Sequence, residues 1–419
     1  MTSFTKRLAA IVASAAMLGA LAACSQDSAG GGDSEAGDLT DTSISGEIRY
    51  AFWDLNQKPA MEQTIAAFNK KYPDVKVKIE TTPGPEFFEK LQTQASSDTL
   101  PDVFWMNAPN FQLYASNKML EPATPLIDQK LADPANYPPE LNELYTLDGV
   151  QYGLPKDYDT IAVFYNTALF DKAGVEYPSK DWTWEEMREK AKAVSTKLDG
   201  VYGVAGNVAG GHETYYNTML QAGGTIISED KKKSGFDDPK SIEGLQYIRD
   251  LIADKSMPTP AELSDTPANQ MFLNGRAAMF WAGSWSNAEL LGSDLKKDIE
   301  VAPLPAGPDG SATVIHGLTN AVSAKSENKP AAQAFQAFLS SEEAAQIQAE
   351  AGAAVPAFNG TQTAWVESAP WNLQVFLDEA ENSAVPYPVS LNTAEWNQLE
   401  VELLPQAFSG ERPVEEVAA

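Results

Sequence analysis

The sequence predicts an α/β protein of two lobes, each a largely parallel sheet flanked by helices, with hinge segments joining them. The chain has 419 residues, which is too many for one hydrophobic core and enough for two domains. Strand and helix patterns alternate both before and after residues 152–166 (YGLPKDYDTIAVFYN). In that segment four polar residues, Lys156 to Asp159, separate Pro155 from an apolar strand. These polar residues could form a surface loop between two strands. The alternation on both sides favours a segment that crosses between two lobes, and such a segment would lie beside a ligand cleft.

The first lobe is predicted from the order strand, helix, strand, helix, strand. These elements are expected at residues 46–53, 58–72, 75–79, 85–97 and 101–105. Met61, Ile65 and Phe68 recur on one helical face of the second element. The β-α-β-α-β order predicts a parallel sheet with helices on both faces.

The second lobe is predicted from a similar alternation after the crossing. Thr183 and Glu186 have the spacing of a capping box and predict the start of a helix. Residues 316–323 (HGLTNAVS) are predicted as a second polar crossing, after a strand at residues 313–315. The predicted division places residues 46–156 and 317–365 in lobe 1, and residues 157–316 and 366–419 in lobe 2.

The N-terminus predicts export and anchoring. Lys6 and Arg7 precede an apolar, alanine-rich stretch that is too short for a normal transmembrane helix. The stretch ends in Leu-Ala-Ala-Cys24, which resembles the bacterial lipobox and implies that Cys24 is lipidated. We therefore expect a signal peptide over residues 1–23 and a lipidated flexible linker over 24–45, on the extracellular face of the bacterial cytoplasmic membrane. A chance cysteine after a signal peptide is the alternative.

The charge of the chain narrows the choice of partners. The formal net charge is −28 at pH 7, with 58 acidic and 30 basic residues. Such a surface repels nucleic acid and anionic headgroups, because both are negatively charged. A neutral or cationic ligand is therefore expected, and no nucleic acid.

The residues that could support catalysis are few. Cys24 is the only cysteine, and the two histidines, His212 and His316, are far apart in the sequence, so no metal site is predicted. No nucleophile elbow, P-loop or dinucleotide fingerprint follows a strand. No catalytic residue and no cofactor is therefore predicted. Carboxylates are abundant, so residue types alone leave a surface glycosidase open.

Aromatic and polar residues gather at the ends of predicted strands. Aromatic rings can pack on the apolar face of a pyranose while neighbouring polar groups hold its hydroxyls. For each tryptophan, packing in the core is the alternative. The candidate ligand-binding residues are Trp53, Asp54, Asn56, Trp105, Asn107, Asp157, Tyr158, Asp159, Glu213, Tyr215, Trp281, Trp285, His316 and Trp371.

Several stretches resemble one family over nearly the whole mature chain. They include PDVFW, YGLPKDYDTIAVFYN and GRAAMFWAGSW, together with the lipobox. The chain resembles the carbohydrate-type extracellular solute-binding proteins of bacterial ABC importers, similar to maltodextrin- and multiple-sugar-binding lipoproteins. The resemblance implies a monomeric, two-lobed periplasmic-binding-protein fold that closes around an oligosaccharide and docks on the membrane permease subunits.

The resemblance also implies where the sugar is held. It points to the residues after the first strand (Trp53 to Asn56), to Asn107, to the crossing (Asp157 to Asp159) and to Trp285. The sequence departs from the family at Pro109, where an acid can occur. The alternatives are a binding protein for another small solute, such as a peptide or polyamine, and the glycosidase already mentioned.

Overall fold

The computed structural model describes residues 37–419, except for the side chain of Pro85. The predicted signal peptide and Cys24 lie outside the described residues. The prediction of a flexible linker as far as residue 45 is wrong for its last part, because Leu39 is buried. The Leu39 N–H donates to Gln129 Oε1 at 2.8 Å, and Tyr72 Oη donates to the Leu39 carbonyl at 2.8 Å. One leucine in a polar run gave no pattern that could reveal this docking.

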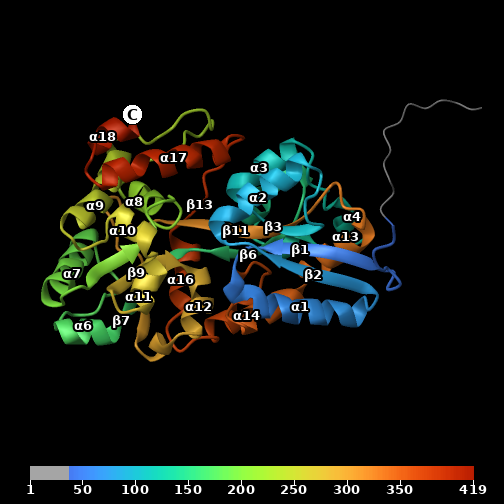
Figure 1. Cartoon of the computed structure of the whole chain (residues 1–419), viewed down its shortest axis with the longest axis horizontal. Helices are drawn as coiled ribbons and strands as arrows, with labels where there is room; N and C mark the ends of the chain where they lie inside the picture. Colours follow the sequence, from blue (N-terminus) through green and yellow to red (C-terminus); the bar gives the residue numbers. More distant parts are fainter. Residues whose placement is uncertain (1–36) are drawn as a thin grey trace, which may run out of the picture. The chain divides into compact units, whose positions relative to one another are not determined.

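The strands of the described residues form two large sheets and one short hairpin (Figure 1). We call the part around the larger sheet lobe 1. Its strand order is β12-β6-β11-β3-β1-β2, with β13 also paired to β11. These strands are β1 (Gly46–Phe52), β2 (Val75–Thr81), β3 (Val103–Asn107), β6 (Pro155–Asp159), β11 (Thr313–Val322), β12 (Val355–Pro356) and β13 (Ala384–Pro386).

The helices of lobe 1 follow the predicted order closely. α1 begins with a proline in its first turn, and its apolar face, including Met61 and Phe68, is buried. The helices and turns in this part are η1 (Leu55–Gln57), α1 (Lys58–Lys71), α2 (Gly84–Ser96), α3 (Ala108–Ser116), α4 (Thr124–Asp128), η2 (Pro134–Asn136), α5 (Pro139–Glu143), α13 (Lys329–Leu339), α14 (Glu342–Glu350) and α15 (Gln362–Val366). The hairpin is β4 (Thr146–Leu147) with β5 (Val150–Gln151).

Lobe 2 is built around the second sheet, with strand order β10-β7-β9-β8. Its strands are β7 (Ile161–Asn166), β8 (Tyr202–Gly206), β9 (Ala277–Gly283) and β10 (Ile299–Ala302). Its helices are α6 (Thr167–Ala173), α7 (Trp184–Lys197), α8 (Tyr215–Gln221), α9 (Pro239–Ala253), α10 (Pro260–Asp265), α11 (Ala268–Leu273), η3 (Ser284–Ser286), α12 (Asn287–Leu291), η4 (Asp294–Lys297), α17 (Thr393–Phe408) and α18 (Val414–Ala418). The capping box predicted at Thr183 and Glu186 is confirmed, with both of its hydrogen bonds present at the start of α7. α16 (Gln374–Asn382) contacts β7, β11 and β13, so it packs where the two sheets meet.

Both sheets are mixed, so the prediction of largely parallel sheets is wrong. β1 pairs in parallel with β2 and β3, as the β-α-β-α-β order predicted. β11 is antiparallel to both β3 and β6, and β7 is antiparallel to both β9 and β10. The antiparallel pairs arise because strands that arrive from the other lobe enter the sheets in the opposite direction.

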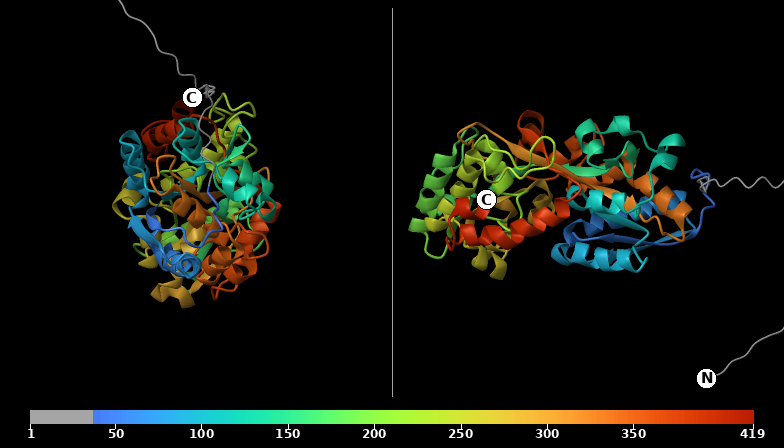
Figure 2. Two further views of the ribbon diagram at one scale, coloured as in Figure 1. Left: turned by 90° about the vertical axis from the view of Figure 1, so that its right-hand side faces the viewer. Right: turned by 90° about the horizontal axis from the view of Figure 1, so that it is seen from above.

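Two strand segments connect the lobes. β6 belongs to the larger sheet and β7 to the smaller one, with only Thr160 between them. β11 is a single ten-residue strand, so the prediction of a strand followed by a polar crossing loop at residues 316–323 is corrected. Its polar residues are buried, and groups on other strands hydrogen-bond to them: Tyr50 Oη donates to Asn320 Oδ1, and the Ile161 N–H donates to Thr313 Oγ1. The right-hand view of Figure 2 shows β11 (orange) running between the two halves. Among the helices of the described residues, none combines the length and apolar character needed to cross a membrane.

Candidate functional site

A cavity of about 540 Å³ lies between residues of the two lobes. On the lobe 1 side it is lined by Trp53, Asp54 and Asn56, which directly follow β1. The Asp54 carboxylate accepts a hydrogen bond from the Asn56 N–H at 2.9 Å and so caps η1. The end of β1 therefore presents an indole, a carboxylate and an amide to the cavity.

The lobe 2 side of this cavity carries Asn207, Glu213 and Trp285. Asn207 Nδ2 donates to Glu213 Oε1 at 2.8 Å, and burial raises the pKa of the Glu213 carboxyl. Trp285 lies in η3, immediately after the buried strand β9, and is only partly buried. Its indole packs so closely on Gly283 that a Cβ at that position would collide with the ring. The glycine thus fixes the ring at the wall of the cavity.

A buried ion pair lies in the crossing strand β6. Lys156 Nζ and Asp157 Oδ2 are 2.5 Å apart, with side-chain exposures of only 4% and 5%. Lys156 Nζ also lies 4.4 Å from the centre of the Trp105 ring and 3.2 Å from Gln57 Oε1, to which it donates. Burial raises the pKa of Asp157, and the adjacent ammonium opposes that rise. Asp157 Oδ1 accepts from the Leu318 N–H at 3.0 Å, so the pair also joins β6 to β11.

The next carboxylate, Asp159, lies between the two histidines. His212 Nε2 is 2.8 Å from Asp159 Oδ1, and His316 Nδ1 is 3.4 Å from Asp159 Oδ2. Burial would raise the pKa of Asp159, but the two imidazoles outweigh it and lower the pKa to about 2. Burial lowers the pKa of His316. The histidines that are far apart in the sequence are therefore neighbours, with ring centres 4.8 Å apart.

Two further predicted residues flank this cluster. Asn107 is the N-cap of α3, and its Oδ1 accepts from the Asn110 N–H at 3.2 Å. The following amide, Ala108 N–H, donates to His316 Nε2 at 3.3 Å. Tyr158 is buried beside Asp159 in the hydrophobic core. Asn107 and Tyr158 therefore lie beside the Asp159 cluster and do not line the cavity.

Besides Tyr158, four predicted aromatic residues are buried in the core and do not line the cavity. Trp105, Tyr215 and Trp281 are fully buried, and Trp371 is 3% exposed. Trp105 Nε1 donates to Tyr50 Oη at 2.7 Å, and Trp371 Nε1 donates to Asn287 Oδ1 at 3.1 Å. Trp105 and Trp281 lie in the buried strands β3 and β9, Tyr215 begins helix α8, and Trp371 precedes α16. Their sequence context resembled that of Trp285, but each is covered by the core.

Some residues at the site were not predicted. His212 completes the cluster around Asp159, and its position directly before Glu213 was the only signal in the sequence. Asn207 was missed because it lies in a glycine-bearing loop after β8. The other unpredicted lining residues are Gly84, Leu263, Pro267, Ala268, Asn269, Phe280, Ser286 and Glu289.

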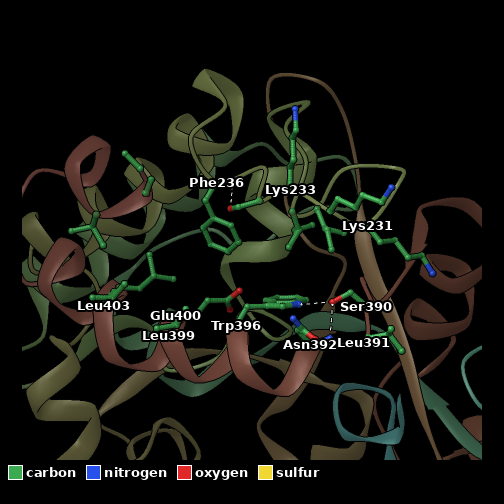
Figure 3. Close-up of a pocket in the computed structure, with 18 of the residues that line it drawn as sticks. Lys231, Lys233, Phe236, Ser390, Leu391, Asn392, Trp396, Leu399, Glu400 and Leu403 are labelled. Atoms are coloured by element: carbon green, nitrogen blue, oxygen red, sulfur yellow. Dashed lines mark hydrogen bonds between the residues drawn. The ribbon is translucent and has the colours of Figure 1, made fainter. Parts of the chain in front are cut away.

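A larger cavity, of about 770 Å³, is lined by residues of lobe 2. Trp396, Leu399 and Leu403 of α17 form one wall, and Phe236 faces them (Figure 3). Glu400 accepts hydrogen bonds from the hydroxyls of Tyr215 and Tyr216 at 2.8 Å, and burial raises its pKa to about 7. Size alone would favour this cavity, but the 540 Å³ cavity takes its lining from both lobes and is more polar. We therefore take the smaller one, which we call the cleft, as the candidate site.

The cleft combines two indoles with amides and carboxylates. Such a set can hold a polar, uncharged molecule through hydrogen bonds and contact its apolar face with a ring. Asp54, Glu213 and Glu289 give it acidic character. The arrangement is that of a binding site at the junction of two lobes.

Comparison with known proteins agrees with this arrangement. The sequence profile of the family described as bacterial extracellular solute-binding protein matches residues 53–346. The arabinooligosaccharide-binding protein of Bacillus subtilis (strain 168) is 27% identical over 312 residues, covering 71% of this chain and 70% of its own length. The galactooligosaccharide-binding protein of the same organism is 25% identical over 371 residues, covering 84% and 80%.

A solved structure is also similar. It is an ABC substrate-binding protein of Listeria monocytogenes in complex with cycloalternan, with a TM-score of 0.83 and 28% identity. The match covers 89% of this chain and 96% of that one. The two-lobed periplasmic-binding-protein fold is thereby confirmed. With a family profile that spans most of its length and a cleft between two lobes, the chain belongs to the bacterial extracellular solute-binding proteins.

Proposed function

We propose that this protein captures an oligosaccharide in the cleft and delivers it to the permease of an ABC importer. One observation carries the proposal: Trp53 and Asp54 on one lobe face Glu213 and Trp285 on the other across a single cavity. Rings with neighbouring hydrogen-bonding groups suit a pyranose. Relatives named for arabino- and galactooligosaccharides support the same substrate class.

A ligand screen tests this proposal. Purified protein is titrated by calorimetry with arabino-, galacto- and maltooligosaccharides of two to six units, and with a tripeptide and spermidine. We expect saturable binding of at least one oligosaccharide, at one site per chain. If spermidine or the peptide binds and no oligosaccharide does, the protein captures a different solute. The acidic lining of the cleft would then explain the preference for a cation. Chromatography of the oligosaccharides after long incubation separates binding from hydrolysis, because a glycosidase would release shorter products.

We also propose the predicted division into lobes, 46–156 with 317–365 and 157–316 with 366–419, as the units that move on closure. The division cuts β6 and β11 of the larger sheet, and β13 pairs with the part of β11 that falls in the second unit. Ligand contacts to both lobes exist only when the lobes are together, so a bound sugar should stabilise the closed form. We expect a saturating oligosaccharide to reduce the radius of gyration in solution scattering, with the two crossing segments acting as hinges. An unchanged radius with a ligand bound tightly would mean that the cleft is rigid or already closed.

The lipid anchor at Cys24 remains part of this proposal. The sequence Leu-Ala-Ala-Cys at the end of the apolar stretch supports it. In the native host, Cys24→Ala should move the protein from the membrane fraction to the soluble fraction or the medium. If that variant stays with membranes after an alkaline wash, the anchor must lie elsewhere.

A further inference from the structure

The only two histidines of the chain meet at one carboxylate. His212 comes from the loop before α8, His316 from the crossing strand β11, and Asp159 from the end of the crossing strand β6. One donor atom from each lies within 4.8 Å of the other two. We propose that Asp159, His212 and His316 form a binding site for a divalent transition-metal ion of the zinc type.

The donor set fits such an ion. Two imidazole nitrogens and a carboxylate oxygen are common ligands of zinc, copper and nickel, whereas calcium and magnesium prefer oxygen donors alone. With bonds of about 2.0–2.1 Å, the donors of a tetrahedral zinc site are about 3.3 Å apart. The two histidine–carboxylate distances here are 2.8 and 3.4 Å. All three donor atoms lie within 4.8 Å of one another, so the widest pair must approach by up to about 1.5 Å to complete three coordinate bonds.

Two buried atoms of this cluster lack partners. Asp159 Oδ1 and His212 Nε2 make no hydrogen bond with any described residue, although they lie 2.8 Å apart. The two atoms are close enough for a hydrogen bond, but the angle between them does not allow one. Asp159 is only 8% exposed, and a buried polar atom without a partner destabilises the folded state. A cation between the two atoms would satisfy both.

The surroundings also favour a cation. Two more carboxylates adjoin the cluster, because Asp157 lies two residues before Asp159 and Glu213 directly follows His212. The neighbouring ammonium, Lys156, is already paired with Asp157. Three protein ligands leave a fourth position open to water or to another small ligand. The rings of Trp285 and Tyr387, centred 5.4 and 5.7 Å from that of His212, border this site.

One contact must change when the ion binds. His316 Nε2 accepts from the Ala108 N–H, so the imidazole carries its proton on Nδ1, facing Asp159. Ligation through Nδ1 displaces that proton, and the neutral ring then carries its proton on Nε2. The Ala108 hydrogen bond, at 3.3 Å, is lost, and the net contribution of one such bond to stability is modest. This is small beside the free energy of binding a zinc-type ion.

Metal binding is tested without sugar, so the result is independent of the proposed function. The full mature protein is stripped with EDTA, dialysed and titrated with ZnCl₂ by calorimetry. We expect one ion per chain. His212→Gln, His316→Gln and Asp159→Asn should each weaken zinc binding at least about tenfold, since each removes a ligand. Glu289→Gln, which removes a carboxylate from the cleft but not from the cluster, should bind zinc as the wild type does.

The wild-type protein provides a second measurement that does not depend on the variants folding. Because the chain has only two histidines, its imidazole region in an NMR spectrum should hold two sets of signals, and both should shift with one equivalent of zinc. The proposal is overturned if zinc binding does not saturate at one ion, if the imidazole signals do not move, or if the histidine variants bind as tightly as the wild type. Sugar titration in EDTA tests the proposed function separately.

Discussion

Trp285→Ala is expected to weaken oligosaccharide binding by about 2–4 kcal/mol, roughly 30- to 900-fold in Kd, while the protein still folds. The indole is partly exposed at the wall of the cleft and rests on the backbone at Gly283. Removing a ring that stacks on a sugar reduces the contact area with the ligand but changes the packing of the core little. Calorimetric affinity and the free energy of unfolding are measured on the same variant.

Trp182→Phe is the matched control for this prediction. Trp182 belongs to the same lobe, is fully buried and donates its Nε1 proton to the Pro303 carbonyl at 2.8 Å. The control should lose stability while the folded fraction keeps its affinity. If instead Trp285→Ala loses about 3–5 kcal/mol of stability and binds sugar normally, Trp285 is a core residue. The lobe 2 wall of the proposed site would then have to be placed elsewhere.

Lys156→Met is expected to destabilise the protein by about 3–5 kcal/mol, because it leaves the Asp157 carboxylate buried without its counter-ion. Lys156→Met/Asp157→Asn should recover most of this loss, since it removes both charges and keeps an oxygen that can accept from Leu318 N–H. Lys58→Met is the control: Lys58 pairs with Glu62 at the surface, at 3.7 Å, and its loss should cost about 0.5 kcal/mol or less.

The pH dependence gives this prediction a second check. Burial raises the pKa of Asp157 above its usual range, and loss of Lys156 removes what opposes that rise. The folded state then resists ionisation of Asp157 while the unfolded state does not. The destabilisation should therefore be small below the pKa of an unfolded aspartate, about 3.9, and grow as the pH rises through it. Denaturant unfolding at about pH 3.5 and pH 7 measures the difference. A single variant within 1 kcal/mol of wild type at pH 7 would contradict the role of the pair.

Local patterns in the sequence were sufficient for most elements of the fold. The capping box at Thr183 and the helical stripe of α1 depend on residues a few positions apart, and both were predicted. Sheet direction was not, because it depends on which distant strand pairs with which. β11 is the clearest case: its polar residues predicted a loop, whereas burial between β3 and β6 makes them part of a ten-residue strand.

For the candidate site, too, residues that follow one strand could be predicted from the sequence, whereas contacts between distant segments could not. Trp53, Asp54 and Asn56 were predicted together because they end one strand, and they line the cleft together. Trp105 and Trp281 also lie in aromatic strands, but helices or strands from elsewhere cover them, and no local signal distinguishes them from Trp285. The pairing of His212 with His316 could not be predicted either, because it depends on two crossings that bring separate segments to Asp159.

In the larger sheet, strands that are far apart in the sequence are neighbours, and this limits when the sheet can form during synthesis. β3 ends at residue 107, but β11, the strand that covers its edge, begins only at residue 313. A chain that emerges N-terminus first therefore holds an open, apolar strand edge until about three quarters of it has appeared. Such edges pair with other chains, and pairings between distant strands form slowly. We expect premature release to yield aggregates, and a holding chaperone to be needed until the central strand arrives.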